Sequence, residues 1–137
     1  SNNKPESKYD KPVWVNITQP SAASACQNLY SGVNSDLMNS YAWDTAILFI
    51  QKYSGDEAFS VKSYTSGRVN NTGKNDLRCN IYDMGGNCYE FTTETATSSY
   101  PCMVRGGHIS AFYTSNRNIA ATTTTDYLLS FRPILYL

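Results

Sequence analysis

Apolar residues recur at helical spacing in two places in the first half of the chain. In the first, Ala22, Cys26 and Leu29 are spaced by four and then three residues, which is the period of one helix face. Pro20 precedes them, and proline suits the first turn of a helix because that turn needs no N–H donor there. The pattern predicts a short amphipathic helix that ends at Ser31-Gly32.

The second helical period is stronger and centres on a tryptophan. Ser40 is the expected N-cap, and Tyr53-Ser54-Gly55 is the expected end. We expect the tryptophan to be a core residue. The apolar positions of the predicted face are Trp43, Ala46, Ile47 and Ile50.

The rest of the chain has the short apolar runs and glycine turns that are typical of strands. Residues 54–79 are rich in Ser, Gly, Asn, Lys and Asp, and predict a long surface segment with at most a short strand or turn around Phe59–Tyr64. Two helices followed by short strands indicate an α+β fold. The predicted strands are 13–17, 88–93, 103–105 and 131–137.

Composition narrows the class of protein. The chain has 137 residues, which is normally one domain. Its 11 basic and 11 acidic residues cancel, which argues against nucleic-acid binding. No apolar run reaches the roughly 18 residues of a membrane span, so we expect no membrane insertion. Residues 1–11 are polar and predict a tag remnant or a linker from a preceding N-terminal domain, and residues 12–137 predict one domain.

The cysteines give no metal motif. Cys26, Cys79, Cys88 and Cys102 form no CxxC pair, and the single histidine excludes the common Cys/His zinc spacings. A disulfide between Cys79 and either Cys88 or Cys102 is one interpretation. Four reduced, mostly buried thiols is the interpretation that we favour.

Motifs for catalysis are absent from the sequence. It contains no GxSxG, HExxH, Walker A or GxGxxG pattern. The pairs Gly85-Gly86 and Gly106-Gly107 lack a following helix that could hold a phosphate, so they predict turns or bulges. His108 is expected to be an exposed loop histidine without a catalytic role.

Three carboxylates leave one cofactor question open. Asp83, Glu90 and Glu94 could supply oxygens to a structural calcium ion, although their spacing matches no defined calcium loop. The alternative is that Asp83 caps a turn and that Glu90 is a buried ion-pair partner of Arg105 or Arg132. We predict no other cofactor and no metal.

Three motifs carry a resemblance to a known family. NIYDMGGNCYEFTTE (80–94), CMVRGG (102–107) and SFRPILYL (130–137) occur in this order, and together they resemble the C-type lectin fold of the formylglycine-generating-enzyme type from about residue 12 onward. The resemblance implies two helices packed on small, mostly antiparallel sheets with long loops. It assigns structural roles to Trp43, Asp83, Gly85, Gly86, Asn87, Glu90, Arg105, Gly106, Gly107, Arg117, Phe131 and Arg132.

The sequence departs from the family where the chemistry would lie. The oxidase members have catalytic cysteines after the RGG element, but no cysteine follows Cys102 here. One histidine cannot supply the iron site of the sulfoxide synthases, and the EPN and WND sugar motifs of animal lectins are missing. The resemblance therefore implies the fold without the enzyme activity.

The branch that this sequence resembles most is the variable proteins of diversity-generating retroelements from phages and bacteria. In that branch an error-prone reverse transcriptase randomises adenines in C-terminal codons, mostly AAY, which cannot become Lys, Glu, Gln, Met or Trp codons. None of these five types occurs from Gly106 to Leu137, whereas eighteen occur in residues 1–105. About five would be expected in the tail at the same rate.

The resemblance implies a non-enzymatic binding module with a variable region at about 106–130. Its ligand would be a protein or glycan on a host or neighbouring cell, and it would reside on a phage virion or a bacterial surface. Aromatic side chains would be natural anchors because they offer large contact area. The expected contact residues are His108, Ile109, Ser110, Ala111, Phe112 and Tyr113, then Asn118, Ile119, Ala121 and Thr123, then Asp126, Tyr127 and Leu128.

Two alternatives remain at this point. The first is an oxidase of the formylglycine-generating type, which would need a metal-binding cysteine pair near the C-terminus. The second is a structural module of a virion or cell surface, with no ligand at the loop. We expect Ser115, Asn116, Arg117, Leu129, Phe131 and Arg132 to be fixed framework around the variable positions.

Overall fold

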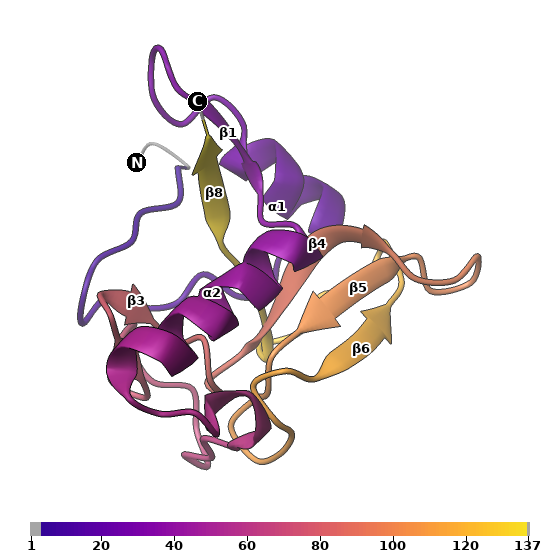
Figure 1. Ribbon diagram of the computed structural model, residues 1–137. Coiled ribbons are helices and arrows are strands. Elements are labelled where there is room, and N and C mark those ends of the chain that lie inside the picture. Colours follow the sequence, from indigo (N-terminus) through magenta and orange to yellow (C-terminus); the bar gives the residue numbers. More distant parts are fainter. Residues whose placement is uncertain (1–3, 137) are drawn as a thin grey trace.

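The computed structural model describes residues 4–136, and these form an α+β fold in which both α-helices lie in the first half of the chain and most strands follow them (Figure 1). This confirms the predicted fold class. In chain order the elements are α1 (Gln19–Cys26), β1 (Asn34–Leu37), α2 (Ser40–Ser54), the 3-10 helix η1 (Phe59–Val61), β2 (Leu77–Arg78), β3 (Ile81–Tyr82), β4 (Tyr89–Thr95), β5 (Cys102–Arg105), β6 (Arg117–Ala120), β7 (Leu129–Phe131) and β8 (Pro133–Tyr136).

The central sheet has the strand order β6-β5-β4-β7. β4, β5 and β6 are antiparallel neighbours, whereas β7 runs parallel to β4. Two smaller sheets complete the fold, and one of them pairs β1 with β8 near the C-terminal end of the chain, as Figure 1 shows. The sheets are small and mostly antiparallel, as the resemblance implied.

The strand register decides where the two C-terminal loops meet. β6 ends at Ala120 opposite Cys102, at one end of the sheet, and β7 begins at Leu129 opposite Tyr89, at the other. Residues 121–128 must therefore travel back along the sheet. The 106–116 connection leaves β5 after Arg105, which lies opposite Glu90. Both loops consequently reach the end of the sheet at which Tyr89 lies.

Two apolar clusters form the core. One lies between α1 and the central sheet and contains Cys26 and Phe91, both fully buried. The other lies under α2 and contains Trp43, Ile50 and Phe59. The expectation that Trp43 is a core residue is confirmed, because only 1% of it is exposed.

α2 begins and ends close to the expected residues, but α1 is shorter than predicted: Gln27 is extended and Asn28 adopts φ 56°, so the helix stops before Leu29 and the expected end at Ser31-Gly32. α1 ends at Cys26 and is capped by Thr18, whose side chain accepts a hydrogen bond from the Ser21 amide. α2 ends at Gly55, which adopts φ 73° as a left-handed C-cap. Its N-cap is Asn39 and not Ser40. The Ser40 hydroxyl instead donates to Glu94.

Two strand predictions need correction. Residues 13–17 form no strand, because Asn16 adopts φ 57°, a left-handed conformation that a strand cannot continue through. The predicted strand 131–137 is divided at Arg132 between two sheets, since β7 pairs with β4 and β8 with β1. Its last residue, Leu137, lies outside the described residues.

Other elements were not predicted. β1, β2, β3 and β6 are short strands without an alternating pattern, and β6 lies in the 117–131 stretch that has no clear period. The element around Phe59 is a 3-10 helix. Short strands of this kind are fixed by their partners in the sheet more than by their own residues.

Two arginines flank the core tryptophan. The guanidinium of Arg132 lies 5.5 Å from the Trp43 ring centroid and that of Arg105 lies 5.9 Å away. Arg132 forms a two-pronged ion pair with Glu90, whereas Arg105 pairs with Asp44. Of the two partners considered for Glu90, Arg132 is therefore the one that the structure shows.

The carboxylates considered for calcium each bind protein donors. Asp83 accepts hydrogen bonds from the Gly73 and Asp76 amides at 2.7 and 3.0 Å, which is the turn-capping role. Glu90 pairs with Arg132, and Glu94 with Arg117. Among residues 4–136 no three His, Cys, Asp or Glu side chains gather into a metal site, so the calcium hypothesis has no support from their positions.

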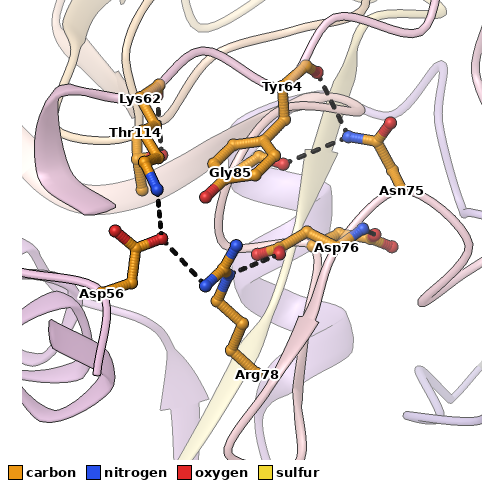
Figure 2. A network of polar contacts seen from close by, with 9 residues as sticks. Asp56, Lys62, Tyr64, Asn75, Asp76, Arg78, Gly85 and Thr114 are labelled. Carbon is orange, nitrogen blue, oxygen red and sulfur yellow. Dashed lines mark hydrogen bonds and ion pairs between the residues drawn. The ribbon is translucent and has the colours of Figure 1, made fainter. Parts of the chain in front are cut away.

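A polar network fastens the irregular 54–79 segment to the body of the protein. Figure 2 shows Arg78 between two carboxylates, with its guanidinium 2.9 Å from Asp56 and 2.9 Å from Asp76. Lys62 makes a 2.7 Å ion pair with Asp56 as well. Arg78 also lies over the Phe59 ring, at 5.2 Å from its centroid. The segment is thus ordered by charge pairs although it has little regular structure.

Candidate ligand-binding surface

The 106–116 connection begins with two glycines that the geometry requires. Gly106 adopts φ 82°, and a Cβ on Gly107 would lie 2.5 Å from the Phe112 carbonyl oxygen. The backbone then folds back on itself, with the His108 amide donating to Ala111 at 3.1 Å. At the predicted turn or bulge the chain bends at Gly106, and the turn itself lies at Ile109 and Ser110. The turn places the side chain of Phe112 on the surface, 48% exposed.

The 54–79 segment binds the 106–116 connection through hydrogen bonds. The Ile109 carbonyl accepts hydrogen bonds from the Ser66 and Gly67 amides at 2.9 and 2.8 Å. Thr114 is fully buried, and its amide and hydroxyl both donate to the Lys62 carbonyl. Figure 2 places Thr114 and Lys62 beside the polar network. The connection is therefore anchored mainly through backbone atoms.

Ile109 has to be removed from the expected contact set. It is only 8% exposed, and its carbonyl is bound by the Ser66 and Gly67 amides. Its neighbours His108 and Ser110 remain accessible. The sequence could not show this difference, since nothing in the 106–113 stretch marks which apolar residue faces inward.

An aromatic cluster joins the 106–116 connection, hereafter the first loop, to the sheet. The Tyr89 ring lies 5.0 Å from the His108 ring and 5.9 Å from the Phe112 ring, centroid to centroid, and the two loop rings are 5.5 Å apart. The Tyr89 hydroxyl accepts a 3.3 Å hydrogen bond from the side-chain Nδ2 of Asn116. Tyr89 thus connects β4 to the loop.

An open groove continues from Tyr89 between β6 and the second loop, residues 121–128, with a volume of about 280 Å³. β4 and β5 form its floor, and β6 and the second loop form its walls. The exposed Tyr100 of the β4–β5 hairpin lies beside them. The lining residues are Tyr89, Tyr100, Val104, Asn118, Ile119, Ala120, Ala121, Thr124, Asp126, Leu128 and Leu129.

The second loop is held at its C-terminal end. The Asp126 carbonyl accepts hydrogen bonds from the Asn16 amide at 3.1 Å and from the Leu129 amide at 3.2 Å. Its carboxylate accepts a 2.7 Å hydrogen bond from the Leu128 amide. The segment that was predicted as a strand at 13–17 therefore supports this loop.

All three blocks of expected contact residues meet around Tyr89. His108 and Phe112 touch its ring, and Asn118, Asp126 and Leu128 line the groove with it. Ile119 and Ala121 also line the groove. Four expected contact residues are exposed but do not line the groove: Ser110, Tyr113, Thr123 and Tyr127. Ala111 is half-buried and does not line it either.

Six lining residues lie outside the expected contact set: Leu129 was expected as framework, and Tyr89, Tyr100, Val104, Ala120 and Thr124 were missed. Tyr89 and Tyr100 precede the predicted variable region, and Thr124 lies inside it but was not selected. Alternation along β4 could have shown that Tyr89 shares a face with Phe91. No signal in the sequence marks Tyr100, which comes from a hairpin distant in sequence.

Burial shifts two titratable groups at this surface. It lowers the pKa of His108, and the carboxylate of Asp126 opposes that shift. It also raises the pKa of Tyr89, although Asn118 and Asn116 beside the hydroxyl oppose the shift. His108 is therefore neutral at pH 7.

The expected framework residues differ in burial. Leu129 and Phe131 are buried, and so is Ser130 between them, which was not in the expected set and whose hydroxyl donates to the Trp14 carbonyl at 3.1 Å. Arg117 is exposed but is held by its ion pair with Glu94. These residues bind other parts of the fold and frame the groove.

The cysteines offer no reactive thiolate at this surface. All four are free, and Cys26, Cys88 and Cys102 are buried. Burial raises the pKa of both Cys26 and Cys88 to about 12. Because the thiolate is the nucleophile and the metal ligand, these groups are inert. The favoured interpretation of mostly buried, reduced thiols agrees with the structure.

Comparison with known proteins identifies the fold. No protein-family model matches the sequence, and no curated protein matches it significantly. The solved structure of PvdO from Pseudomonas aeruginosa shares the fold with a TM-score of 0.72 and 15% identity over 93% of this chain and 63% of that one. Treponema denticola variable protein 1 shares it with a TM-score of 0.67 and 11% identity over 90% and 70% of the two chains.

These likenesses confirm the C-type lectin fold of the formylglycine-generating-enzyme type, which the three motifs indicated. They include a variable protein, the class that the sequence resembles most. The present chain spans a little under two thirds of the length of PvdO. At such identities the likeness establishes the fold alone.

Proposed function

We propose that this chain is a non-enzymatic binding module that presents a diversified C-terminal surface, as a variable protein of a diversity-generating retroelement. The observation that supports the proposal is that three separate blocks of expected variable residues meet around Tyr89: two of them line the groove with Tyr89, and the first contacts its ring through His108 and Phe112. Residues far apart in the sequence form a single surface there. A randomised tail would be useful only if its positions formed such a surface.

The way in which these residues are held also supports the proposal. The loops are anchored by backbone groups such as the Ile109 and Asp126 carbonyls, which any residue supplies. The side-chain hydrogen bonds of the expected contact residues are mostly made with one another, for example between Ser110 and His108 and from the Leu128 amide to Asp126. The exception is Asn118, whose amide lies beside the Tyr89 hydroxyl. Most of these side chains can change without removing a bond that the framework needs.

The composition of the tail is consistent with this origin. The five residue types that AAY randomisation cannot reach are absent from Gly106 to Leu137. The framework outside the tail, in contrast, uses one of those types at its centre, because Glu90 pairs with Arg132. A fixed scaffold with a randomised surface would have this distribution of residue types, with the five types in the scaffold and absent from the surface.

A selection experiment tests the binding capacity of the surface. A display library would vary the expected contact residues except Ile109 within the set that AAY codons reach, and would be selected against hen egg lysozyme. A control library would vary exposed positions on the outer face of α2, among them Tyr41, Leu48 and Tyr53. We expect folded binders from the first library at a much higher frequency than from the second. Equal frequencies would contradict the proposal.

A further inference from the structure

The dimensions of the groove restrict what can fill it. Its volume of about 280 Å³ lies below the range of roughly 300–1,000 Å³ that is usual for small-molecule sites. The groove is also open to solvent along its length. It therefore suits a side chain that projects from a larger ligand better than it suits a whole metabolite.

The walls favour a ligand group with an aliphatic part. Val104, Ile119 and Leu128 form much of the lining, together with Ala120 and Leu129. A sugar would bury hydroxyl groups against these side chains, and a buried hydroxyl without a partner costs about 1–3 kcal/mol in proteins. Of the two ligand classes considered from the sequence, the groove favours a protein over a glycan.

One charge distinguishes the groove. Of the described residues that line it, Asp126 alone carries a charge. The Leu128 amide binds its Oδ1 atom, so Oδ2 remains available. The nearby His108 is neutral at pH 7, because burial lowers its pKa. Arg117, the cationic residue of β6, is paired with Glu94. No described group therefore neutralises Asp126.

Aromatic rings stand at both ends of the groove. Tyr89 lies at the end of the sheet, and Tyr100 is 52% exposed on the hairpin. The faces of aromatic rings attract cations, and the planar guanidinium of arginine also stacks on them. Tyr89 is only 7% exposed and packs against His108 and Phe112, so Tyr100 is the ring with an open face. An aliphatic wall, the Tyr100 ring and one free carboxylate oxygen together match the parts of an arginine side chain.

We infer that the groove receives a basic side chain from a protein ligand, arginine in preference to lysine, with its aliphatic stem between Ile119 and Leu128 and its charged end at Asp126. This inference rests on the proposed function, because it assigns a ligand class to the same surface. It goes further in predicting that the sequence now displayed has a charge preference. A chain with other residues at the variable positions would have a different charge preference.

The test is a selection of random twelve-residue peptides on phage against the full chain at pH 7. Parallel selections use Asp126→Asn, which keeps an oxygen for the Leu128 amide, and Glu57→Gln as a matched loss of one charge. Glu57 is exposed, and its side chain makes no described hydrogen bond or ion pair. A third variant, Ile119→Ser with Leu128→Ser, removes the apolar walls. Urea unfolding midpoints verify that each variant is folded.

We expect arginine at a fixed position of the consensus from the wild-type chain and from Glu57→Gln, and no such enrichment from Asp126→Asn. The synthetic consensus peptide should bind Asp126→Asn roughly 10- to 100-fold more weakly, the range for a charge-assisted contact. Replacing its arginine by norleucine should cause the same loss in wild-type and no further loss in Asp126→Asn.

The two possible failures can be told apart. A consensus without basic residues whose binding is lost in the Ile119→Ser, Leu128→Ser variant would overturn the charge preference and leave the proposed surface intact. Peptides that bind all variants equally, or a selection that enriches no groove-dependent peptide, would contradict both the inference and the proposed surface.

Discussion

The buried ion pair between Arg132 and Glu90 should be the most sensitive polar contact of the scaffold. Besides its two contacts with Glu90, Arg132 donates to the Tyr82 carbonyl at 2.9 Å and lies 5.5 Å from the Trp43 ring centroid. The side chains of Arg132 and Glu90 are only 19% and 9% exposed. Removing the cation would therefore leave a carboxylate and a carbonyl without their partners inside the protein.

The expected loss of stability follows from this burial. Breaking a buried pair by removing one partner typically costs about 3–5 kcal/mol, out of roughly 5–15 kcal/mol for a whole domain. We predict that Arg132→Met lowers the free energy of unfolding by about 3–5 kcal/mol. The double variant with Glu90→Gln should recover part of the loss, because no unpaired charge then remains.

Arg117 provides a matched control. It also pairs with a glutamate, Glu94, but the two side chains are 45% and 30% exposed. An exposed pair contributes only about 0–1 kcal/mol, so Arg117→Met should change stability little. Urea unfolding followed by tryptophan fluorescence measures both variants, because Trp43 is buried beside Arg132. Equal losses for the two variants would refute the reasoning.

Three further predictions concern single groups. His108, the only histidine, should titrate below the usual value of about 6.5 by NMR, and Asp126→Asn should lower its pKa further; an unchanged value would mean that the two loops do not meet. Because the folded protein binds this proton less readily than the unfolded chain, the contribution of His108 to stability is lost as the pH falls through 6.5. Cys79, the one cysteine that is not buried, should be the first to react with a thiol reagent at pH 8, and equal rates for all four would contradict the described burial. Asn39→Ala should cost about 0.5–2 kcal/mol in thermal unfolding as the loss of an N-cap, and no cost would restore Ser40 as the cap.

The sequence predicted those parts of the fold that depend on specific motifs. The glycine pairs and the helix around Trp43 follow from residues that few other arrangements would accept, whereas the sequence left Arg105 and Arg132 both open as partners of Glu90 and only the structure shows Arg132. The prediction was wrong at 13–17, where a single left-handed residue, Asn16, interrupts an otherwise strand-like pattern. β6 was missed because its strand character comes from pairing with β5.

The candidate surface was predicted in part for a related reason. The motifs marked where the variable region begins and ends, but not which of its residues face outward. Ile109 is buried, and its carbonyl binds amides of the 54–79 segment, whose course depends on charge pairs and not on a period. Tyr100 joins the groove through the β4–β5 hairpin. Such long-range contacts leave no local trace in the sequence.

The DNA around the gene tests the central claim most directly. If the C-terminal surface is diversified by a retroelement, a near-copy of the codons for residues 106–137 should lie close to a reverse-transcriptase gene. It should differ from those codons only at adenines, and chiefly at codons for the groove and loop residues. The codons for residues 1–105 serve as the control and should have no such copy. A copy that differs at other bases, or no copy at all, would contradict the proposed diversification.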